Sequence, residues 1–143
     1  MLAKTLVEGR DRAVVTTTPD TTATAAARLL HDRRIGALVV VDGSGAIVGI
    51  LSERDVARGA ALHGGGALDT LPVSALMSPK VTLCNPTDSV EKLMAVMTGL
   101  RIRHLPMVED GKLVGMVSIG DVVKAALEDA AAEAQQLRDY IAT

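Results

Sequence analysis

A tandem repeat constrains the fold of this chain more than any other feature. The segment 49–56, Gly-Ile-Leu-Ser-Glu-Arg-Asp-Val, returns at 115–122 as Gly-Met-Val-Ser-Ile-Gly-Asp-Val, so the numbering offset is 66 (115 − 49). Earlier in each copy the offset is 67, as between Ile35 and Ile102 (102 − 35). The offset changes within a predicted turn, where a structural repeat tolerates a change of length. The sequence therefore predicts two copies of one structural unit.

The apolar pattern within each copy predicts the order β-α-β-β-α. Stretches of β-branched residues predict strands, and apolar residues at helical spacing predict helices. In the first copy the predicted strands are 13–17, 35–41 and 47–51, and the predicted helices are 22–33 and 52–59. In the second copy the strands are 81–84, 102–108 and 113–117, and the helices are 89–97 and 118 onward. The predicted fold class is mixed α/β, in the α+β sense, with small sheets packed against helices.

For two of the predicted helices, the sequence also indicates which residues form the apolar side. A short amphipathic helix is expected at 1–12, with Leu2, Leu6 and Val7 on one side and a break at Gly9. For the helix at 22–33, Asp20 or Thr21 is the expected cap, and the expected buried stripe consists of Ala23, Ala26, Ala27 and Leu30.

The repeat and one glycine-rich stretch set the expected domain boundaries. A linker is expected at 64–72, because Gly64-Gly65-Gly66 is the sharpest local break in the pattern. We therefore expect a first repeat with its N-terminal helix at 1–63, a second repeat at 73–127 and a C-terminal helical extension at 128–143.

Each copy places Ser-x-x-Asp where a predicted strand enters a helix: Ser52 with Asp55, and Ser118 with Asp121. One interpretation is structural. In a capping box the serine accepts from the backbone N–H three residues on, and the acidic side chain accepts from the N–H of the serine. The other is functional, because unpaired N–H groups and the helix dipole favour a phosphate, while the carboxylate can accept from a ribose diol. A serine can serve both roles, so both interpretations stay open.

Composition limits the classes of partner. The chain has 143 residues, 48% hydrophobic and 22% charged, which is typical of a globular protein. A net charge of −2 argues against broad attraction to nucleic acid or anionic membranes. Tyr140 is the single aromatic residue, so no stacking platform for single-stranded nucleic acid exists. The single cysteine, Cys84, and the lack of a signal-peptide or membrane-spanning pattern favour a cytoplasmic protein.

No pattern of residues predicts catalysis or a metal site. His63-Gly64-Gly65-Gly66 is similar to an oxyanion-hole stretch, but no Gly-x-Ser-x-Gly nucleophile accompanies it. Cys84 and His104 lack a third orienting group. The three histidines, at 31, 63 and 104, do not have metal-ligand spacing. We therefore expect that the protein is not an enzyme.

Apolar residues continue at heptad spacing beyond the second repeat. They alternate four and three apart, which is typical of a coiled-coil seam: Val123, Leu127, Ala130, Ala134, Leu137 and Ile141. Two interpretations stay open. The helix packs on its own domain, or it forms the seam of a homodimer.

With both copies placed, the sequence resembles a tandem pair of cystathionine β-synthase-type (CBS) domains, also called a Bateman module, over about residues 10–127. The segments that carry the resemblance are 35–41 and 49–56 in the first copy, and 102–108 and 115–122 in the second. The resemblance implies two repeats related by a pseudo-twofold axis. It also implies clefts that bind AMP, ADP or ATP, and in some members NAD or S-adenosylmethionine derivatives.

The resemblance also implies which residues form the two sites. Asp55 and Asp121 would hold ribose hydroxyls, and Ser52 and Ser118 would hold phosphate. Each cleft would take its base-binding wall from the other copy. Opposite Asp55 would lie Val81, Ile102, Arg103, His104 and Pro106, and opposite Asp121 would lie Val14, Ile35, Gly36 and Ala37. The first copy departs from the family pattern at Val39, where the second has Pro106.

Charge is expected to differ between the two clefts. Arg54, Arg103, His104 and Lys80 would gather around a phosphate in the cleft of Ser52. The cleft of Ser118 offers Gly120 and a small uncharged wall, with only the distant Arg12. Because charge-assisted bonds to phosphate are the stronger kind, the first cleft would prefer nucleotides over nucleosides more steeply.

Taken together, the sequence predicts a non-catalytic, adenine-nucleotide-binding regulatory module that acts in signal transduction as a homodimer and passes its ligand state to a regulated protein. The alternatives are a binder of NAD(H) or S-adenosylmethionine, or a ligand-free interaction module in which Ser-x-x-Asp only caps helices.

Overall fold

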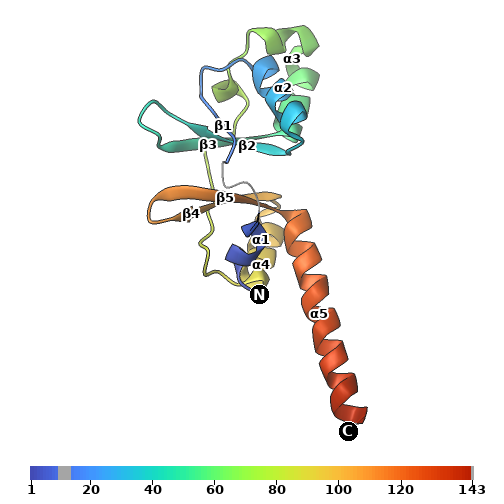
Figure 1. The fold of residues 1–143 in the computed structure, drawn as a ribbon. Helices are drawn as coiled ribbons and strands as arrows, with labels where there is room; N and C mark the ends of the chain where they lie inside the picture. Colours follow the sequence, from blue (N-terminus) through green and yellow to red (C-terminus); the bar gives the residue numbers. More distant parts are fainter. Residues whose placement is uncertain (10–13, 143) are drawn as a thin grey trace. The chain divides into compact units, whose positions relative to one another are not determined.

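The computed structural model describes residues 1–9 and 14–142 (Figure 1). The chain forms two compact units. One is Val15–Val81, and the other combines Met1–Val14 with Thr82–Thr143. Each unit packs helices against a small sheet, so the predicted mixed α+β class is confirmed. The predicted strand at 13–17 and the predicted helix at 1–12 both extend into residues 10–13, which lie outside the described residues.

The unit Val15–Val81 contains a three-stranded sheet in the order β1-β2-β3. The strands are β1 (Thr16–Thr17), β2 (Ala37–Val41) and β3 (Ile47–Ser52), with β1 parallel and β3 antiparallel to the central β2. Helices α2 (Ala23–Arg33) and α3 (Glu53–His63) lie on one side of this sheet (Figure 1). Residues 37–40 of β2 are all buried, as expected for a central strand covered by helices. The core of this unit includes Leu30, Leu38, Leu51 and Val73.

The other unit contains the antiparallel pair β4 (His104–Glu109) and β5 (Lys112–Ser118). Its helices are α1 (Ala3–Val7), α4 (Val90–Leu100) and α5 (Ile119–Ala142). The predicted strand at 81–84 is reduced to one bridge. The Cys84 N–H donates to the carbonyl of Pro106 at 2.9 Å, and the Cys84 carbonyl accepts from Val108 at 3.0 Å. The core of this unit includes Leu93, Met97, Leu105 and Val117.

The N-terminal helix packs with the second repeat, which differs from the predicted first repeat at 1–63. The N–H groups of Ala3 and Lys4 donate to the carbonyls of Asp88 at 2.7 Å and Pro86 at 2.9 Å. Ala3 is fully buried in the core of this unit. The first repeat is completed instead by the segment after α3, where Val73 is buried and its N–H donates to the carbonyl of Thr21 at 2.8 Å. Each compact unit therefore includes the segment that precedes the other repeat.

The predicted linker at 64–72 is a folded part of its unit. It contains the 3-10 helix η1 (Gly65–Asp69), whose Asp69 accepts from the hydroxyl of Thr24 on α2 at 2.6 Å. Helix α3 also runs to His63 instead of ending near Gly59. Gly59 is buried against Leu76, and a Cβ built on it would lie 2.8 Å from a Leu76 methyl group. This glycine therefore permits close packing and does not stop the helix.

The cap and the buried stripe of α2 differ in detail from the prediction. Thr22 caps α2 by accepting from the Ala25 N–H at 3.2 Å, whereas the expected cap Asp20 accepts from the hydroxyl of Thr18. In the predicted stripe of α2, Ala23, Ala26 and Leu30 are buried and Ala27 is half-buried. Helices α2 and α4 both end at an arginine in the left-handed region, Arg34 and Arg101 with φ of 54° and 55°. These arginines occupy equivalent positions of the two copies, so the repeat extends to helix termination.

Replacing Gly49 by alanine is expected to destabilise the protein by about 1–3 kcal/mol, the usual cost of overpacking. A Cβ at this buried position would lie 2.5 Å from the Met77 sulfur and 3.0 Å from the Ser78 carbonyl oxygen. That carbonyl is held by the Ile50 N–H at 3.0 Å, so it cannot easily move. Urea unfolding would measure the loss. The matched control is Gly43→Ala, where nothing lies within 4 Å, and equal stability of the two variants would contradict the packing argument.

Candidate functional site

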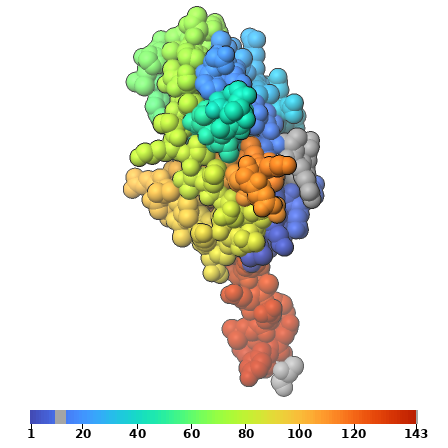
Figure 2. All heavy atoms as spheres, turned by 90° about the vertical axis from the view of Figure 1, so that its left-hand side faces the viewer, coloured from blue at the N-terminus to red at the C-terminus, as the bar shows by residue number. Residues whose placement is uncertain are grey.

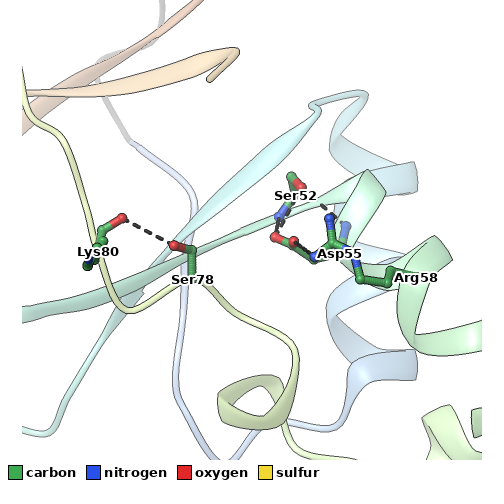
Figure 3. Close-up of polar contacts among 5 residues, drawn as sticks. All are labelled: Ser52, Asp55, Arg58, Ser78 and Lys80. Atoms are coloured by element: carbon green, nitrogen blue, oxygen red, sulfur yellow. Dashed lines mark hydrogen bonds and ion pairs between the residues drawn. The ribbon is translucent and has the colours of Figure 1, made fainter. Parts of the chain in front are cut away.

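The Ser52-x-x-Asp55 motif forms a complete capping box at the start of α3 (Figure 3). The Asp55 N–H donates to the Ser52 hydroxyl oxygen at 3.2 Å, and the Ser52 N–H donates to the Asp55 carboxylate at 2.8 Å. The Ser52 hydroxyl also donates to the same carboxylate oxygen at 3.0 Å. The structural interpretation of this motif is therefore confirmed, and the functional interpretation has to be compatible with these bonds.

The second carboxylate oxygen of Asp55 faces Arg58. The Arg58 guanidinium lies 3.3 Å from Oδ1, and its side chain is 65% exposed, against 14% for Asp55. An exposed pair of this kind contributes little to stability. The Asp55 carboxylate therefore sits at a partly open position, with one oxygen engaged in the cap and the other beside an exposed arginine. Sequence analysis did not identify Arg58, although its i, i+3 spacing from Asp55 was a signal.

The second motif repeats this geometry at the start of α5. The Ser118 N–H donates to the Asp121 carboxylate at 3.0 Å, and the Asp121 N–H donates to the Ser118 hydroxyl oxygen at 3.3 Å. Both serines and both aspartates are half-buried. Two chemically equivalent groups, each a hydroxyl and a carboxylate at a helix N-terminus, therefore recur at equivalent positions of the two repeats.

Backbone hydrogen bonds tie each motif to the loop before the adjacent strand. The Glu53 N–H donates to the carbonyl of Gly36 at 3.0 Å, and the Ile119 N–H donates to the carbonyl of Arg103 at 2.8 Å. These two carbonyls occupy equivalent positions of the repeat, and sequence analysis did not identify this role for them. At each helix N-terminus the fold thus uses two amides before any ligand is considered, this one and the one that donates to the serine hydroxyl.

Strand register places some of the predicted wall residues beside a motif of their own repeat. Ala37 lies opposite Ser52, and His104 lies opposite Ser118. One unit holds Ile35, Gly36, Ala37, Ser52, Arg54, Asp55, Lys80 and Val81, and the other holds Val14, Ile102, Arg103, His104, Pro106, Ser118, Gly120 and Asp121. The walls that were expected to come from the other repeat involve residues of both units, and they stay a prediction.

The predicted positive groups differ in exposure and placement. Arg54, Lys80 and Arg103 are exposed, and His104 is half-buried. In Figure 3, the backbone carbonyl of Lys80 accepts from the Ser78 hydroxyl at 3.3 Å. Because Arg103 adjoins the strand partner of Ser118, the structure places this charge in the unit of the second motif. That Arg103 binds a phosphate in the cleft of Ser52 stays a prediction. Arg12 lies outside the described residues.

Among the wall residues, Pro106 and Ala37 are buried, and Val14, Ile35, Gly36, Val81 and Ile102 are half-buried. Gly120 is exposed. The buried members form part of the sheets, so they can shape a site only through their backbone or through neighbouring side chains.

Cys84 is a structural residue. Its side chain is 1% exposed, and burial raises the pKa of its thiol to about 11. Among residues 1–9 and 14–142, no group of three or more histidine, cysteine, aspartate or glutamate side chains is arranged to hold a metal ion. Over the same residues, no helix combines the length and apolar character needed to span a membrane.

We expect thiol reagents to modify the native protein only slowly at pH 8, because the reactive form is the thiolate. The raised pKa also means that the unfolded chain loses this proton first. Folding stability is therefore expected to fall as the pH rises from about 9 to 11. The rate of labelling with iodoacetamide, with and without urea, measures the protection of the thiol. The fall of folding stability with pH that is due to this thiol should be absent in the control Cys84→Ser. Equal labelling rates in the two conditions would contradict the burial argument.

Comparison with known proteins finds the CBS domain pattern at residues 10–61 and 73–128. The chain is 42% identical to a CBS-domain protein of Agrobacterium tumefaciens, whose crystal structure superposes with a TM-score of 0.82 over 87% of this chain and 92% of that one. It is 38% identical over 128 residues to the CBS domain-containing protein CBSX3, mitochondrial, of Arabidopsis thaliana. That match covers 87% of this chain but 62% of the relative's length. A structure of CBSX2 in complex with AMP is 26% identical, with a TM-score of 0.67, over 82% of this chain and 90% of that one.

Proposed function

Since the chain belongs to the CBS domain family and carries two copies of the domain, we propose that it is a non-catalytic regulatory module that binds an adenine nucleotide. The ligand class is AMP, ADP or ATP, with NAD(H) as a further candidate. The AMP complex of the similar protein CBSX2 supports this class. Binding changes the arrangement or assembly of the module and thereby acts on a regulated protein.

The observation that carries this proposal is the recurrence of one polar arrangement at two helix N-termini. Ser52 with Asp55 and Ser118 with Asp121 make equivalent hydrogen bonds. A helix N-terminus favours phosphate through its N–H groups and its dipole. A serine hydroxyl has one proton to donate, so the Ser52 hydroxyl, which donates to Asp55 in this structure, would turn from that carboxylate toward a phosphate oxygen when the ligand binds. A carboxylate has acceptor sites beyond those used by the cap, and these suit the hydroxyls of ribose.

Regulation by this module requires different affinities for two arrangements of the protein. A ligand that binds two states equally shifts nothing, however tightly it binds. We propose that the responsive assembly is a homodimer, since α5 presents an apolar stripe that its own unit does not cover. The single, unpaired Cys84 fits a reducing compartment, and the cytoplasm is the proposed location.

One observation favours a second candidate, a ligand-free interaction module. The capping bonds of both motifs are complete without any ligand, so helix capping alone accounts for Ser-x-x-Asp. The two candidates differ in whether a nucleotide stabilises the fold.

Thermal melting with AMP, ADP, ATP, NADH and S-adenosylmethionine tests the proposal. A ligand that binds only the native state raises the melting temperature, and a concentration one hundred times Kd contributes about 2.7 kcal/mol. We expect AMP, ADP or ATP to raise it in proportion to the logarithm of concentration. An unchanged melting temperature with all five compounds would favour the interaction module.

A further inference from the structure

Helix α5 continues well beyond the unit that it belongs to. It spans Ile119–Ala142, 24 residues, and its buried residues, Val122 and Ala125, lie in the first turns. Every residue from Ala130 to Ala142 is exposed. Figure 1 shows the helix running past α1 and α4, and Figure 2 shows its C-terminal half, in red, without neighbouring atoms around it. This part is roughly 20 Å long at the usual helical rise.

Two apolar stripes on α5 face different surroundings. The first contains Val122 and Ala125 and packs on the core of the unit. The second has heptad spacing, and its large members are exposed by 41% at Val123, 67% at Leu127, 60% at Leu137 and 73% at Ile141. Ala130 and Ala134 complete this stripe. The unit therefore buries one stripe and leaves the other uncovered.

Local interactions alone do not account for the exposed part of this helix, 130–142. This part extends a helix whose first turns are already packed, so it does not require a new first turn, but each added residue is only weakly favourable without tertiary packing, with a propagation constant of about 1–1.6 for good helix formers. The polar side adds two contacts, from Gln135 to Asp139 and from Arg138 to Gln135, both 2.8 Å. Such exposed pairs contribute a few tenths of a kcal/mol each. A second apolar surface against the stripe would supply the missing stabilisation.

We propose that the α5 stripe pairs with α5 of a second copy of the chain in a parallel, in-register coiled coil. This inference rests on the proposed homodimer and adds its orientation. In the heptad repeat of such a coiled coil, every layer of the seam pairs a residue with the same residue of the partner. Positions a are Leu127, Ala134 and Ile141, and positions d are Val123, Ala130 and Leu137. Large side chains then meet at both ends, and alanines meet in the middle.

Charges beside the seam select the parallel orientation. In a parallel pair, a g position faces the e position five residues on in the partner. Glu133 is at g and Arg138 is at e. The pairing therefore places Glu133 of each helix beside the partner's Arg138 and forms two symmetric, opposite-charge contacts.

The antiparallel arrangement fits the apolar layers equally well but brings like charges together. It would match Val123 with the partner's Ile141, and Leu127 with the partner's Leu137. Each g position would then face a g position of the partner helix, and each e position an e position. Glu133 would therefore face the partner's Glu133, and Lys124 would face the partner's Arg138. Like charges in these places are unfavourable. The charge pattern therefore favours the parallel pair over the antiparallel one.

The parallel orientation has a consequence for the candidate site. Helix α5 begins at the second Ser-x-x-Asp motif, Ser118 with Asp121, and ends in the seam. In a parallel pair, both copies of this motif lie at the same end of the coiled coil. A ligand at one motif would then act on the same helix that joins the two chains.

Charge reversal on the full-length chain tests the orientation. We expect Arg138→Glu to raise the dimer dissociation constant roughly tenfold, because two attractive contacts become repulsive. Glu133→Arg combined with Arg138→Glu should restore it. In an antiparallel dimer, Arg138→Glu would instead tighten association by facing Lys124. Analytical ultracentrifugation measures each constant, and tightening, or no change, would overturn the proposal.

Disulfide crosslinking gives an independent readout. Leu137→Cys alone should form a crosslinked dimer under mild oxidation, whereas Ala132→Cys, on the opposite face of the helix, should not. The buried native Cys84 should not interfere. Crosslinking only in a mixture of Leu127→Cys and Leu137→Cys chains would contradict the parallel arrangement. Neither readout involves a nucleotide, so a failure of nucleotide binding is distinguishable from a failure of this inference.

Discussion

Replacing Asp55 or Asp121 by alanine is expected to weaken AMP binding at the altered site about ten- to a hundredfold. Hydrogen bonds to a charged group contribute roughly 1.5–3 kcal/mol, and each 1.4 kcal/mol corresponds to about a tenfold change in affinity. The carboxylates accept from the serine N–H at 2.8 and 3.0 Å. Each variant therefore also loses half of a capping box, which costs about 1 kcal/mol of stability. Calorimetric titration of both variants measures the affinities.

The matched control for these variants is Asp88→Ala. Asp88 also accepts from a backbone N–H three residues before it, that of Asn85 at 2.9 Å, and it pairs with Lys92. It lies outside both Ser-x-x-Asp motifs. We expect this control to lose stability while keeping its nucleotide affinity. If all three variants bind AMP like the unmodified chain, the assigned ribose contact is wrong. Unequal losses at Asp55 and Asp121 would support the predicted inequality of the two sites.

Ending the chain at Asp129 is expected to turn the proposed dimer into a monomer at micromolar concentration. The truncation removes Ala130, Ala134, Leu137 and Ile141 from the stripe but keeps Val122 and Ala125 in the core. It also keeps Asp129, whose carboxylate lies 3.5 Å from the N-terminal amine. Burial of a large apolar side chain stabilises by about 1.5–3 kcal/mol, so two such side chains from each of two chains dominate the association.

Light scattering measures the mass of the truncated and full-length chains. The control is Ala132→Ser, which changes an exposed residue of the same segment on the opposite face. It should remain a dimer. A full-length chain that is itself a monomer at micromolar concentration would show that the stripe does not mediate self-association.

The order of helices and strands was predictable because the same sequence pattern occurs in both repeats. Ser52 and Ser118 directly precede and cap α3 and α5, as the motif predicts. The assignment of helix α1 was not predictable, because Ala3 is buried by tertiary contacts with the second repeat, which lies more than half the chain away in sequence. Gly59 illustrates a second limit. A glycine that stops a helix and one that admits a neighbour such as Leu76 have the same local pattern.

In the candidate site, too, some features were predictable from local sequence and others depend on tertiary contacts. The capping boxes follow from local sequence, since both partners lie within one helical turn of each other. Arg58 and the carbonyls of Gly36 and Arg103 were missed, because their roles depend on how side chains and loops meet the helix N-terminus. The walls expected from the other repeat depend on contacts between the two units, which local patterns do not specify.

The most direct test of the central claim compares AMP with its 2′,3′-dideoxy analogue by calorimetry on the unmodified chain, Asp55→Ala and Asp121→Ala. If the carboxylates hold the ribose diol, the unmodified chain should bind AMP at least about tenfold more tightly than the analogue. The preference should shrink at the altered site of each variant, because both changes remove the same contact. Equal binding of the two compounds by the unmodified chain, or binding of neither, would contradict the account.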